Sequence, residues 1–113
     1  MRINETVKGV HATAKKKGWW DRERDPLELH MLMVSEIAEA TEAVRRGYPA
    51  AFKFNQPLES EDGKPEGEAI ELIDCVIRIM DYFGHMGWDM ERLLKWKMAY
   101  NKTRPYRHGG KAK

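Results

Sequence analysis

Two pairs of acidic residues have the spacing of side chains that share one face of a helix. Glu36 and Glu39 lie in the segment SEIAEATEA, and Glu71 and Asp74 lie in EAIELIDCVI. Residues three positions apart are neighbours on a helix surface, so both acids of a pair can reach one ligand. Carboxylates arranged in this way suit a divalent cation. The sequence therefore predicts a cation site where the two helices pack together.

Glu36 carries the strongest physical argument for this site. At roughly 100° per residue, it falls within the apolar stripe of its helix, which is formed by Leu29, Leu32, Met33, Ile37, Ala40 and Val44. A carboxylate that faces a helical core is costly unless something positive meets it there. We therefore expect a cation beside Glu36.

The second acid pair has two interpretations. Glu71 and Asp74 share the polar side of their helix with Glu68, Arg78 and Asp81, opposite a broad apolar face. Charges on such a side are usually solvated, so these residues alone do not require a ligand. If the two helices pack antiparallel, however, the acids of both helices can converge at the seam.

The ligand types select the cation and indicate a substrate. Clusters of carboxylates suit Mg²⁺, with Mn²⁺ as a substitute, and no Cys or His spacing resembles a zinc site. Mg²⁺ held by a few carboxylates completes its coordination shell with water and phosphate oxygens. A phosphate-bearing substrate is therefore expected.

Lys97, Asn101 and Arg104 form one stripe near the end of the last expected helix. Lysine supplies a point charge, arginine a planar fork and asparagine a neutral donor, which is a useful set for a polyphosphate chain. The alternative is an exposed helix end on which the macrodipole favours basic residues. Spacing alone does not separate these two interpretations.

Three aromatic side chains form a candidate base-binding group. Trp19 and Trp20 follow the first expected helix, and His11 lies one or two turns upstream. The indoles can stack on a nucleobase while the imidazole contacts its edge. The alternative is a hydrophobic plug for a small core or a dimer seam.

The local signals predict an all-α chain with no strands. Asn4 is a candidate N-cap of the first helix, Asp25 followed by proline opens the second, and Asp89 caps the fourth. The helices are expected at 3–17, 26–46, 66–85 and 90–103. A long connection at 47–66 and a basic tail at 104–113 complete one domain that covers residues 1–113.

Composition limits the class of protein. Charged residues make up 34% and hydrophobic residues 42% of the 113 positions, so the core is narrow and burial in an oligomer is expected. The net charge of +2 is too small to imply a nucleic-acid partner. The single Cys75 excludes an intramolecular disulfide and fits a reducing compartment. MRINETVKG lacks the apolar region of a signal peptide, and no apolar run is long enough to span a membrane. A soluble, cytoplasmic protein is expected.

The ordered motifs resemble those of the MazG-like all-α nucleoside triphosphate pyrophosphatases. SEIAEATEA followed by EAIELIDCVI matches the ExxE and ExxD signature of that family. The similarity extends to KKKGWW, to SEDGKPEG and to the ending KMAYNKTRPYRHGGK, which is similar to the short phage- and integron-type branch. The combination of the acidic signature with the KxxxNxxR ending is the specific part of the match.

The resemblance implies a four-helix bundle-like core in a homodimer or homotetramer whose sites draw on two subunits. It implies hydrolysis of a nucleoside triphosphate, at the α–β phosphoanhydride, to the monophosphate and pyrophosphate in nucleotide-pool house-cleaning. The implied metal ligands are Glu36, Glu39, Glu71 and Asp74. The implied phosphate-binding residues are Lys97, Asn101, Arg104, Tyr106 and His108. The implied base-binding residues are His11, Trp19 and Trp20.

The remaining roles follow from these assignments. Glu39, with Glu36 beside it, is expected to orient or deprotonate the attacking water, and Glu68 and Asp81 would support the ligands. The loop is longer than in the most compact relatives, and Lys53 within it has no secure counterpart there; its two interpretations are contact with the substrate and simple solvation. The alternatives are a base-specific dUTP or dCTP pyrophosphatase, a phosphoribosyl-ATP pyrophosphatase, or a non-catalytic helical module that binds a protein or nucleic acid.

Overall fold

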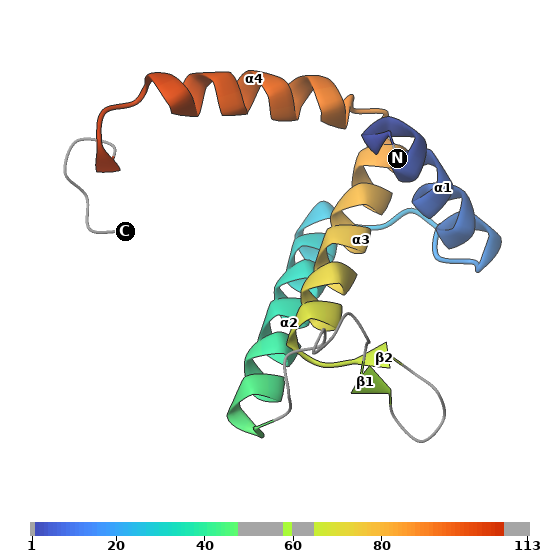
Figure 1. Cartoon of the computed structure of the whole chain (residues 1–113). Coiled ribbons are helices and arrows are strands. Elements are labelled where there is room, and N and C mark those ends of the chain that lie inside the picture. Colours follow the sequence, from blue (N-terminus) through green and yellow to red (C-terminus); the bar gives the residue numbers. More distant parts are fainter. Residues whose placement is uncertain (1, 48–57, 60–64, 108–113) are drawn as a thin grey trace.

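The computed structural model describes residues 2–47, 58–59 and 65–107, which form four helices and one short strand pair (Figure 1). The helices are α1 (Ile3–Lys16), α2 (Pro26–Arg45), α3 (Glu68–Met86) and α4 (Met90–Thr103). All four predicted helices are confirmed, with shifts of one or two residues at four of their eight ends. The chain is all-α apart from the strand pair.

The strand pair corrects the expectation of no strands. β1 (Leu58–Glu59) runs antiparallel to β2 (Pro65–Glu66), with Leu58 opposite Glu66. Both strands lie within the predicted connection at 47–66. They are two residues long, too short for the alternating pattern that identifies a strand in a sequence.

Three helices form the packed body, and the fourth projects from it. α2 and α3 run antiparallel side by side, and α1 packs against the upper part of α3 (Figure 1). α4 leaves the end of α3, contacts α1 near its own start and contains no buried residue. The expected four-helix bundle is therefore not formed within one chain, because α4 has no partner along most of its length in the described structure.

Capping residues account for the starts of α2 and α4. The Asp25 carboxylate accepts a hydrogen bond from the Leu27 amide at 2.9 Å, and Asp89 accepts one from the Arg92 amide at 3.0 Å. Each bond satisfies an amide that has no partner in the first turn of a helix. Both predicted caps are confirmed. Gly87, between α3 and α4, has a φ of 69°, which a residue with a side chain rarely adopts.

Asn4 does not cap α1, which corrects the prediction for that residue. Arg2 occupies the N-cap position, and Asn4 instead contacts the start of α4. Its Oδ1 accepts a hydrogen bond from the Glu91 amide at 3.1 Å, while Glu91 Oε1 accepts one from the Asn4 amide at 2.9 Å. Asn4 Nδ2 also donates to Asp89 Oδ1 at 2.8 Å, and this bond is the main reason that the pKa of Asp89 is lowered. Two helix N-termini thus satisfy each other.

We expect Asn4→Ala to loosen α4 from α1. The substitution removes two side-chain hydrogen bonds and leaves the Glu91 amide unpaired, at a cost of about 1–2 kcal/mol. Amide hydrogen exchange should therefore accelerate over the first turn of α4 and remain unchanged in α2. Thr6→Ala, which removes a bond within α1, is the control. Equal exchange rates in Asn4→Ala and the wild type would contradict this role.

The core is small and lies between α1, α2 and α3. Its buried apolar residues are Val7, Leu29, Ala40, Ala43, Cys75 and Tyr82. Glu36 is buried with them, at 8% exposure, as its position in the stripe predicts. Ile37 and Val44, which were predicted in the same stripe, are 48% and 53% exposed. The side chain of Glu36 faces α3, whereas Ile37 and Val44 do not lie in the buried face. The buried face of α2 is therefore narrower than the apolar pattern suggests.

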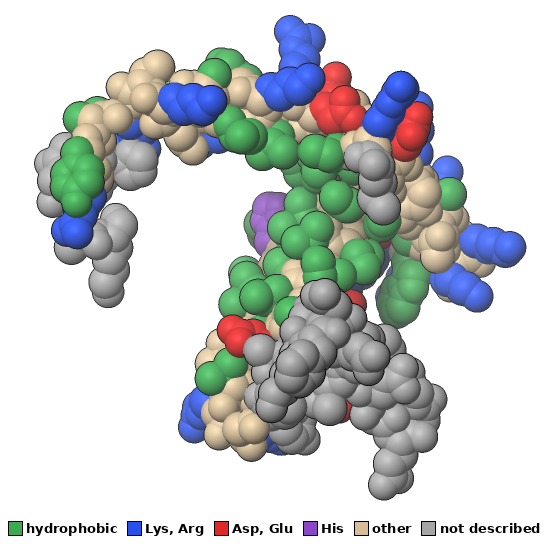
Figure 2. Space-filling view, viewed as in Figure 1, with side chains coloured by type: hydrophobic (Ala, Val, Ile, Leu, Met, Phe, Trp, Pro, Cys, Tyr) green, Lys and Arg blue, Asp and Glu red, His purple; other side chains and the backbone are tan. Residues whose placement is uncertain are grey.

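The apolar side of α3 is exposed, in contrast to the usual arrangement. Leu72, Ile73 and Val76 are each more than 40% exposed, whereas the acids on the other side of the helix are half-buried. Hydrophobic side chains also follow the concave side between α4 and the α2–α3 pair (Figure 2). A single chain therefore leaves much of its apolar surface in contact with water.

Within the described residues, no helix has the length and apolarity needed to cross a membrane.

Candidate metal centre and adjoining groove

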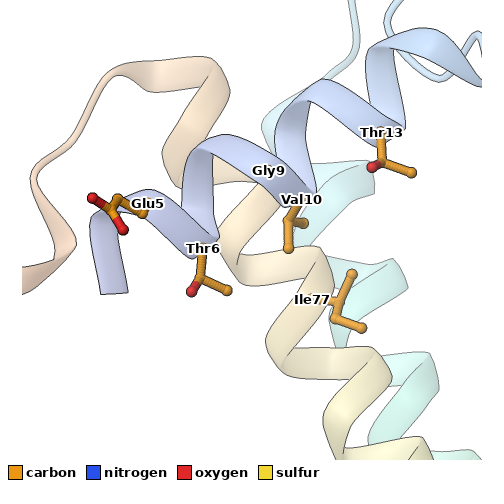
Figure 3. A pocket seen from close by; sticks show the side chains of 6 residues that line it. All are labelled: Glu5, Thr6, Gly9, Val10, Thr13 and Ile77. Carbon is orange, nitrogen blue, oxygen red and sulfur yellow. The ribbon is translucent and has the colours of Figure 1, made fainter. Parts of the chain in front are cut away.

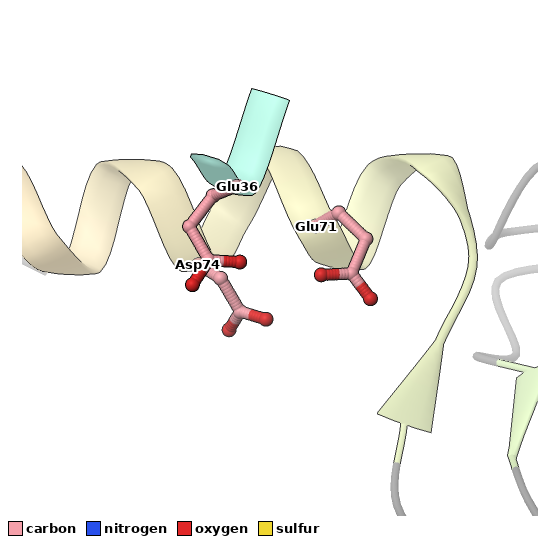
Figure 4. Close-up of side chains that lie close together, drawn as sticks. All are labelled: Glu36, Glu71 and Asp74. Carbon is pink, nitrogen blue, oxygen red and sulfur yellow. The ribbon is translucent and has the colours of Figure 1, made fainter. Parts of the chain in front are cut away.

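Three of the four predicted acidic ligands converge at the seam between α2 and α3. Glu36 comes from α2, and Glu71 and Asp74 come from the first half of α3 (Figure 4). One carboxylate oxygen from each residue lies within 4.8 Å of the other two. The antiparallel packing of the helices thus produces the convergence that the spacing allowed. Opposite ligands of Mg²⁺ lie about 4.2 Å apart, so the three carboxylates are close enough to form a candidate cation site.

Among the described residues, Arg78 is the hydrogen-bond partner of one Glu36 oxygen, and the other oxygen has none. Arg78 Nε donates a hydrogen bond to Glu36 Oε1 at 2.9 Å. Oε2 is fully buried and forms no hydrogen bond within the described structure. Leaving a buried carboxylate oxygen unpaired costs free energy. The positive charge expected beside Glu36 is therefore supplied in part by Arg78, and Oε2 remains available to a cation.

Glu39, the fourth predicted acid, contacts the cluster through Glu71. Burial raises the pKa of Glu71 to about 7, and a hydrogen bond with the Glu39 carboxyl group and the charges of Glu39, Asp74 and Glu36 act in the same direction. A hydrogen bond between two carboxyl groups requires a proton on one of them. The chain alone thus holds more negative charge here than it neutralises.

The raised pKa of Glu71 predicts a pH-dependent stability. Between the ordinary value of 4.5 and about 7, the folded protein retains a proton that the unfolded chain has lost. The free energy of unfolding therefore decreases as the pH rises through this window, and the stabilisation is lost above it. For the protein in the presence of a metal chelator, we expect a lower Tm at about pH 8 than at about pH 5.

Glu71→Gln should flatten this dependence, because it removes the titrating group. Glu68→Gln, in the same helical turn, is the matched control and should keep the wild-type profile. Adding Mn²⁺ at the higher pH should raise the Tm of the wild type, since a cation replaces the proton. A Tm of the wild type that is constant across the window would contradict the assignment.

Two hollows adjoin the acids. A groove of about 370 Å³ lies between α1, the turn that follows it and α3, and Glu36 and Asp74 form part of its wall. A second hollow, of about 290 Å³, lies between the end of α2 and the start of α3 and contains Glu39 and Glu71. Each hollow is thus lined by two of the four predicted acids.

The groove also contains three cationic side chains and an exposed indole. Lys17, Arg24 and Arg78 line it, together with Trp19. Trp19 is 59% exposed, so its ring is accessible to a ligand. Arg24 places its guanidinium 5.8 Å from the centroid of that ring.

His11 and Trp20 are involved in contacts within the protein. The Trp20 indole donates to Asp81 Oδ1 at 2.9 Å, and His11 Nδ1 lies 2.7 Å from the same oxygen. Trp20 also stacks on His85, with ring centroids 3.9 Å apart. The structure thus supports the hydrophobic-plug alternative for Trp20. The base-binding assignments of all three aromatic residues stay predictions.

The predicted phosphate-binding residues of α4 lie away from the acids. Lys97 and Asn101 are exposed, and no residue of α4 lines either hollow beside the acid cluster. Lys97 and Arg104 instead lie over the ring of Tyr100, at 5.1 and 5.8 Å from its centroid. Tyr106 is 83% exposed. Within one chain, these residues and the acids do not form a single site.

The four other predicted residues lie outside the acid cluster or outside the described part of the chain. Asp81 was expected to support the metal ligands, but it accepts hydrogen bonds from the aromatic group. Glu68 is half-buried in the first turn of α3 and is not among the three converging acids. Lys53 and His108 lie outside the described residues.

Arg78 is the functional residue that sequence reasoning missed. It was placed with the solvated charges of α3, yet it meets Glu36 across the seam. A usable signal was present, because Arg78 lies four residues after Asp74 and so shares its helical face. Lys17 and Arg24 gave no comparable signal, since their proximity to the acids depends on the path of the turn after α1.

An apolar hollow of about 560 Å³ lies elsewhere on the molecule, between α1 and α3. Figure 3 shows Thr6, Val10 and Thr13 on one side of α1, with Ile77 on α3 near them. Among the described residues that line it, only Glu5 carries a carboxylate, so they include no group of side chains that could hold a cation.

Comparisons of the chain with protein-family models, with curated proteins and with solved structures find no match.

Proposed function

We propose that the protein is a Mg²⁺-dependent nucleoside triphosphate pyrophosphatase, which converts a nucleoside triphosphate to the monophosphate and pyrophosphate. The observation that carries the proposal is the acid cluster, in which three carboxylates converge and Glu36 Oε2 is buried without a partner. The type of reaction is inferred from the resemblance of the ordered motifs to those of the MazG-like family.

The donor set fits Mg²⁺ or Mn²⁺. Glu36, Glu71 and Asp74 offer only oxygen donors, which these cations prefer. A cation bound there would offset the negative charges of Glu39, Asp74 and Glu36, which add to the effect of burial in raising the pKa of Glu71, and would give the unpartnered oxygen of Glu36 a partner. The same position next to the groove leaves room for phosphate oxygens and water in the coordination shell.

The other roles in the reaction are assigned to side chains of the protein. A bound Mg²⁺ would supply charge stabilisation at the phosphate and would lower the pKa of a bound water. Glu39, at the exposed edge of the cluster, orients or deprotonates the water that attacks the α-phosphorus. The pyrophosphate leaves with its charge balanced by nearby cationic side chains. The reaction requires no covalent nucleophile.

The function is tested with a panel of ordinary and modified ribo- and deoxynucleoside triphosphates, with Mg²⁺ and with EDTA. We expect monophosphate and pyrophosphate in equal amounts, only with the metal. Release of orthophosphate, or no hydrolysis of any compound, would contradict the proposal. A strict preference for one base would favour the dUTP or dCTP alternative, and turnover of phosphoribosyl-ATP would favour the other.

A non-catalytic binding module is the competing proposal. Arg78 gives Glu36 a structural partner, so the buried carboxylate does not by itself require catalysis. The exposed apolar side chains of α4 would suit a protein partner. Tight binding of a protein or nucleic acid without nucleotide turnover would favour this proposal.

The exposed apolar side of α3 supports assembly into a homo-oligomer. We expect light scattering coupled to gel filtration to give a mass at least twice the 13.2 kDa of one chain. Ile73→Asp should shift the protein toward monomers, because it places a charge on this surface. Ala12→Asp, at an exposed position of α1, is the control. A monomeric wild type would contradict the proposed assembly.

A further inference from the structure

The groove beside the acid cluster contains cationic side chains to which the proposed reaction assigns no role. Lys17, at the end of α1, and Arg24, just before α2, line the same groove as Glu36 and Asp74. The four side chains come from segments that are separate in the sequence and meet only in the fold. Acids and cations thus share one groove of about 370 Å³.

Neither Lys17 nor Arg24 forms an ion pair with a carboxylate in the described part of the chain. Arg24 is nevertheless held in place, because its guanidinium lies over two indole rings, 5.8 Å from the centroid of Trp19 and 5.5 Å from that of Trp20. Cation–π contacts of this kind restrain the charged group and do not use its N–H donors. A half-buried arginine whose donors are not paired with a carboxylate suits an anion.

Arg78 differs from these two residues. Its Nε already donates to Glu36, so it neutralises the acid cluster rather than a ligand. Lys17 and Arg24 carry positive charge in this groove that no carboxylate of the described residues pairs. The described residues of α4 do not line this groove, so its cationic side chains other than Arg78 come from the end of α1 and the turn that follows it.

We propose that Lys17 and Arg24 form an anion-binding subsite that holds the phosphate chain of the substrate. The proposal rests on the proposed function, because the phosphate chain would extend from a cation at Glu36 and Asp74 along the groove. Lysine provides a compact charge and arginine a bidentate contact with phosphate oxygens. The substrate class of the subsite is therefore a polyphosphate ester bound together with a divalent cation.

The test measures equilibrium binding, so that it does not depend on turnover. The probes are a nonhydrolysable α,β-imido nucleoside triphosphate and inorganic tripolyphosphate, each with Mn²⁺ and measured by calorimetry. Lys17→Met and Arg24→Met keep much of the aliphatic packing and remove the charge. We expect about a tenfold weaker affinity for both probes in each variant, and about a hundredfold in the double variant.

Two controls separate the subsite from other effects. Lys16→Met removes a neighbouring exposed charge that does not line the groove, and it should bind both probes like the wild type. The affinity for Mn²⁺ alone, followed by electron paramagnetic resonance, should be unchanged in all variants. A loss of Mn²⁺ affinity equal to the loss of probe affinity would overturn the subsite and assign the effect to the metal site.

Each of the other possible results supports or contradicts the anion-binding subsite. A double variant that binds both probes within twofold of the wild type would overturn the proposal. A loss of affinity for the nucleotide but not for tripolyphosphate would also overturn it, because Lys17 and Arg24 would then contact the nucleoside. A wild type that binds both probes but hydrolyses no nucleotide would contradict the proposed function and leave the subsite supported. A wild type that binds neither probe would overturn the subsite.

Discussion

Asp74→Asn is expected to lower kcat/KM for Mg²⁺-dependent release of pyrophosphate by about 10³-fold or more, because several kcal/mol of charge stabilisation depend on the cation. Asparagine keeps the size of the side chain and removes the charge at the point where three carboxylates converge. The helical fold should survive, since Asp74 is only half-buried at the surface of α3. Steady-state release of pyrophosphate and far-ultraviolet circular dichroism measure the two effects.

Glu39→Gln should also abolish turnover, but for a different reason. Glu39 lies at the exposed edge of the cluster, so its loss should affect the attacking water more than the affinity for Mn²⁺. Glu28→Gln, the same substitution in the exposed first turn of α2, is the control for both variants and should retain activity. Wild-type turnover in Asp74→Asn or in Glu39→Gln would exclude the assigned role of that residue.

Arg78→Gln is expected to lower the free energy of unfolding by about 2 kcal/mol in the absence of metal, because it leaves the Glu36 carboxylate buried without a counter-charge. A fully buried pair would cost more, but the Arg78 side chain is 36% exposed and solvent screens part of the loss. Urea denaturation in a chelator measures the change. Saturating Mn²⁺ should recover much of it, since a cation can replace the guanidinium beside Glu36.

The double variant Glu36→Gln with Arg78→Gln separates the ion pair from other effects. If the two side chains interact as the 2.9 Å distance indicates, the double variant should be more stable than Arg78→Gln alone. Arg22→Gln, at an exposed position of the turn after α1, is the matched control and should have wild-type stability. Additive losses in the double variant would show that Arg78 does not stabilise Glu36.

The burial of Glu36 could be predicted from the sequence, but its partner could not. Its position in the apolar stripe predicted its burial, and the structure confirms this at 8% exposure. The inference that a positive group must meet it was also sound. The identity of that group could not be predicted, because Arg78 is 42 residues away in the chain and lies beside Glu36 only when α2 and α3 pack.

Local signals determined the elements of this protein. Asp25 and Asp89 accept hydrogen bonds from amides within their own helices, and Gly87 ends α3 in a left-handed conformation. Such signals act between neighbours in the chain, and they can be recognised without a tertiary structure. The spacing of the acids is likewise a property of each helix alone.

Only the tertiary structure decided how these elements combine. Asn4 contacts Glu91 instead of capping its own helix, α4 projects from the body, and Lys17 and Arg24 enter the groove that contains the acids. Each of these results depends on contacts between segments far apart in the sequence, whose energies are set by packing and burial and not by helical periodicity. The sequence by itself therefore determined the helices and the acids, and the packing of α1, α2 and α3 decided which charges meet.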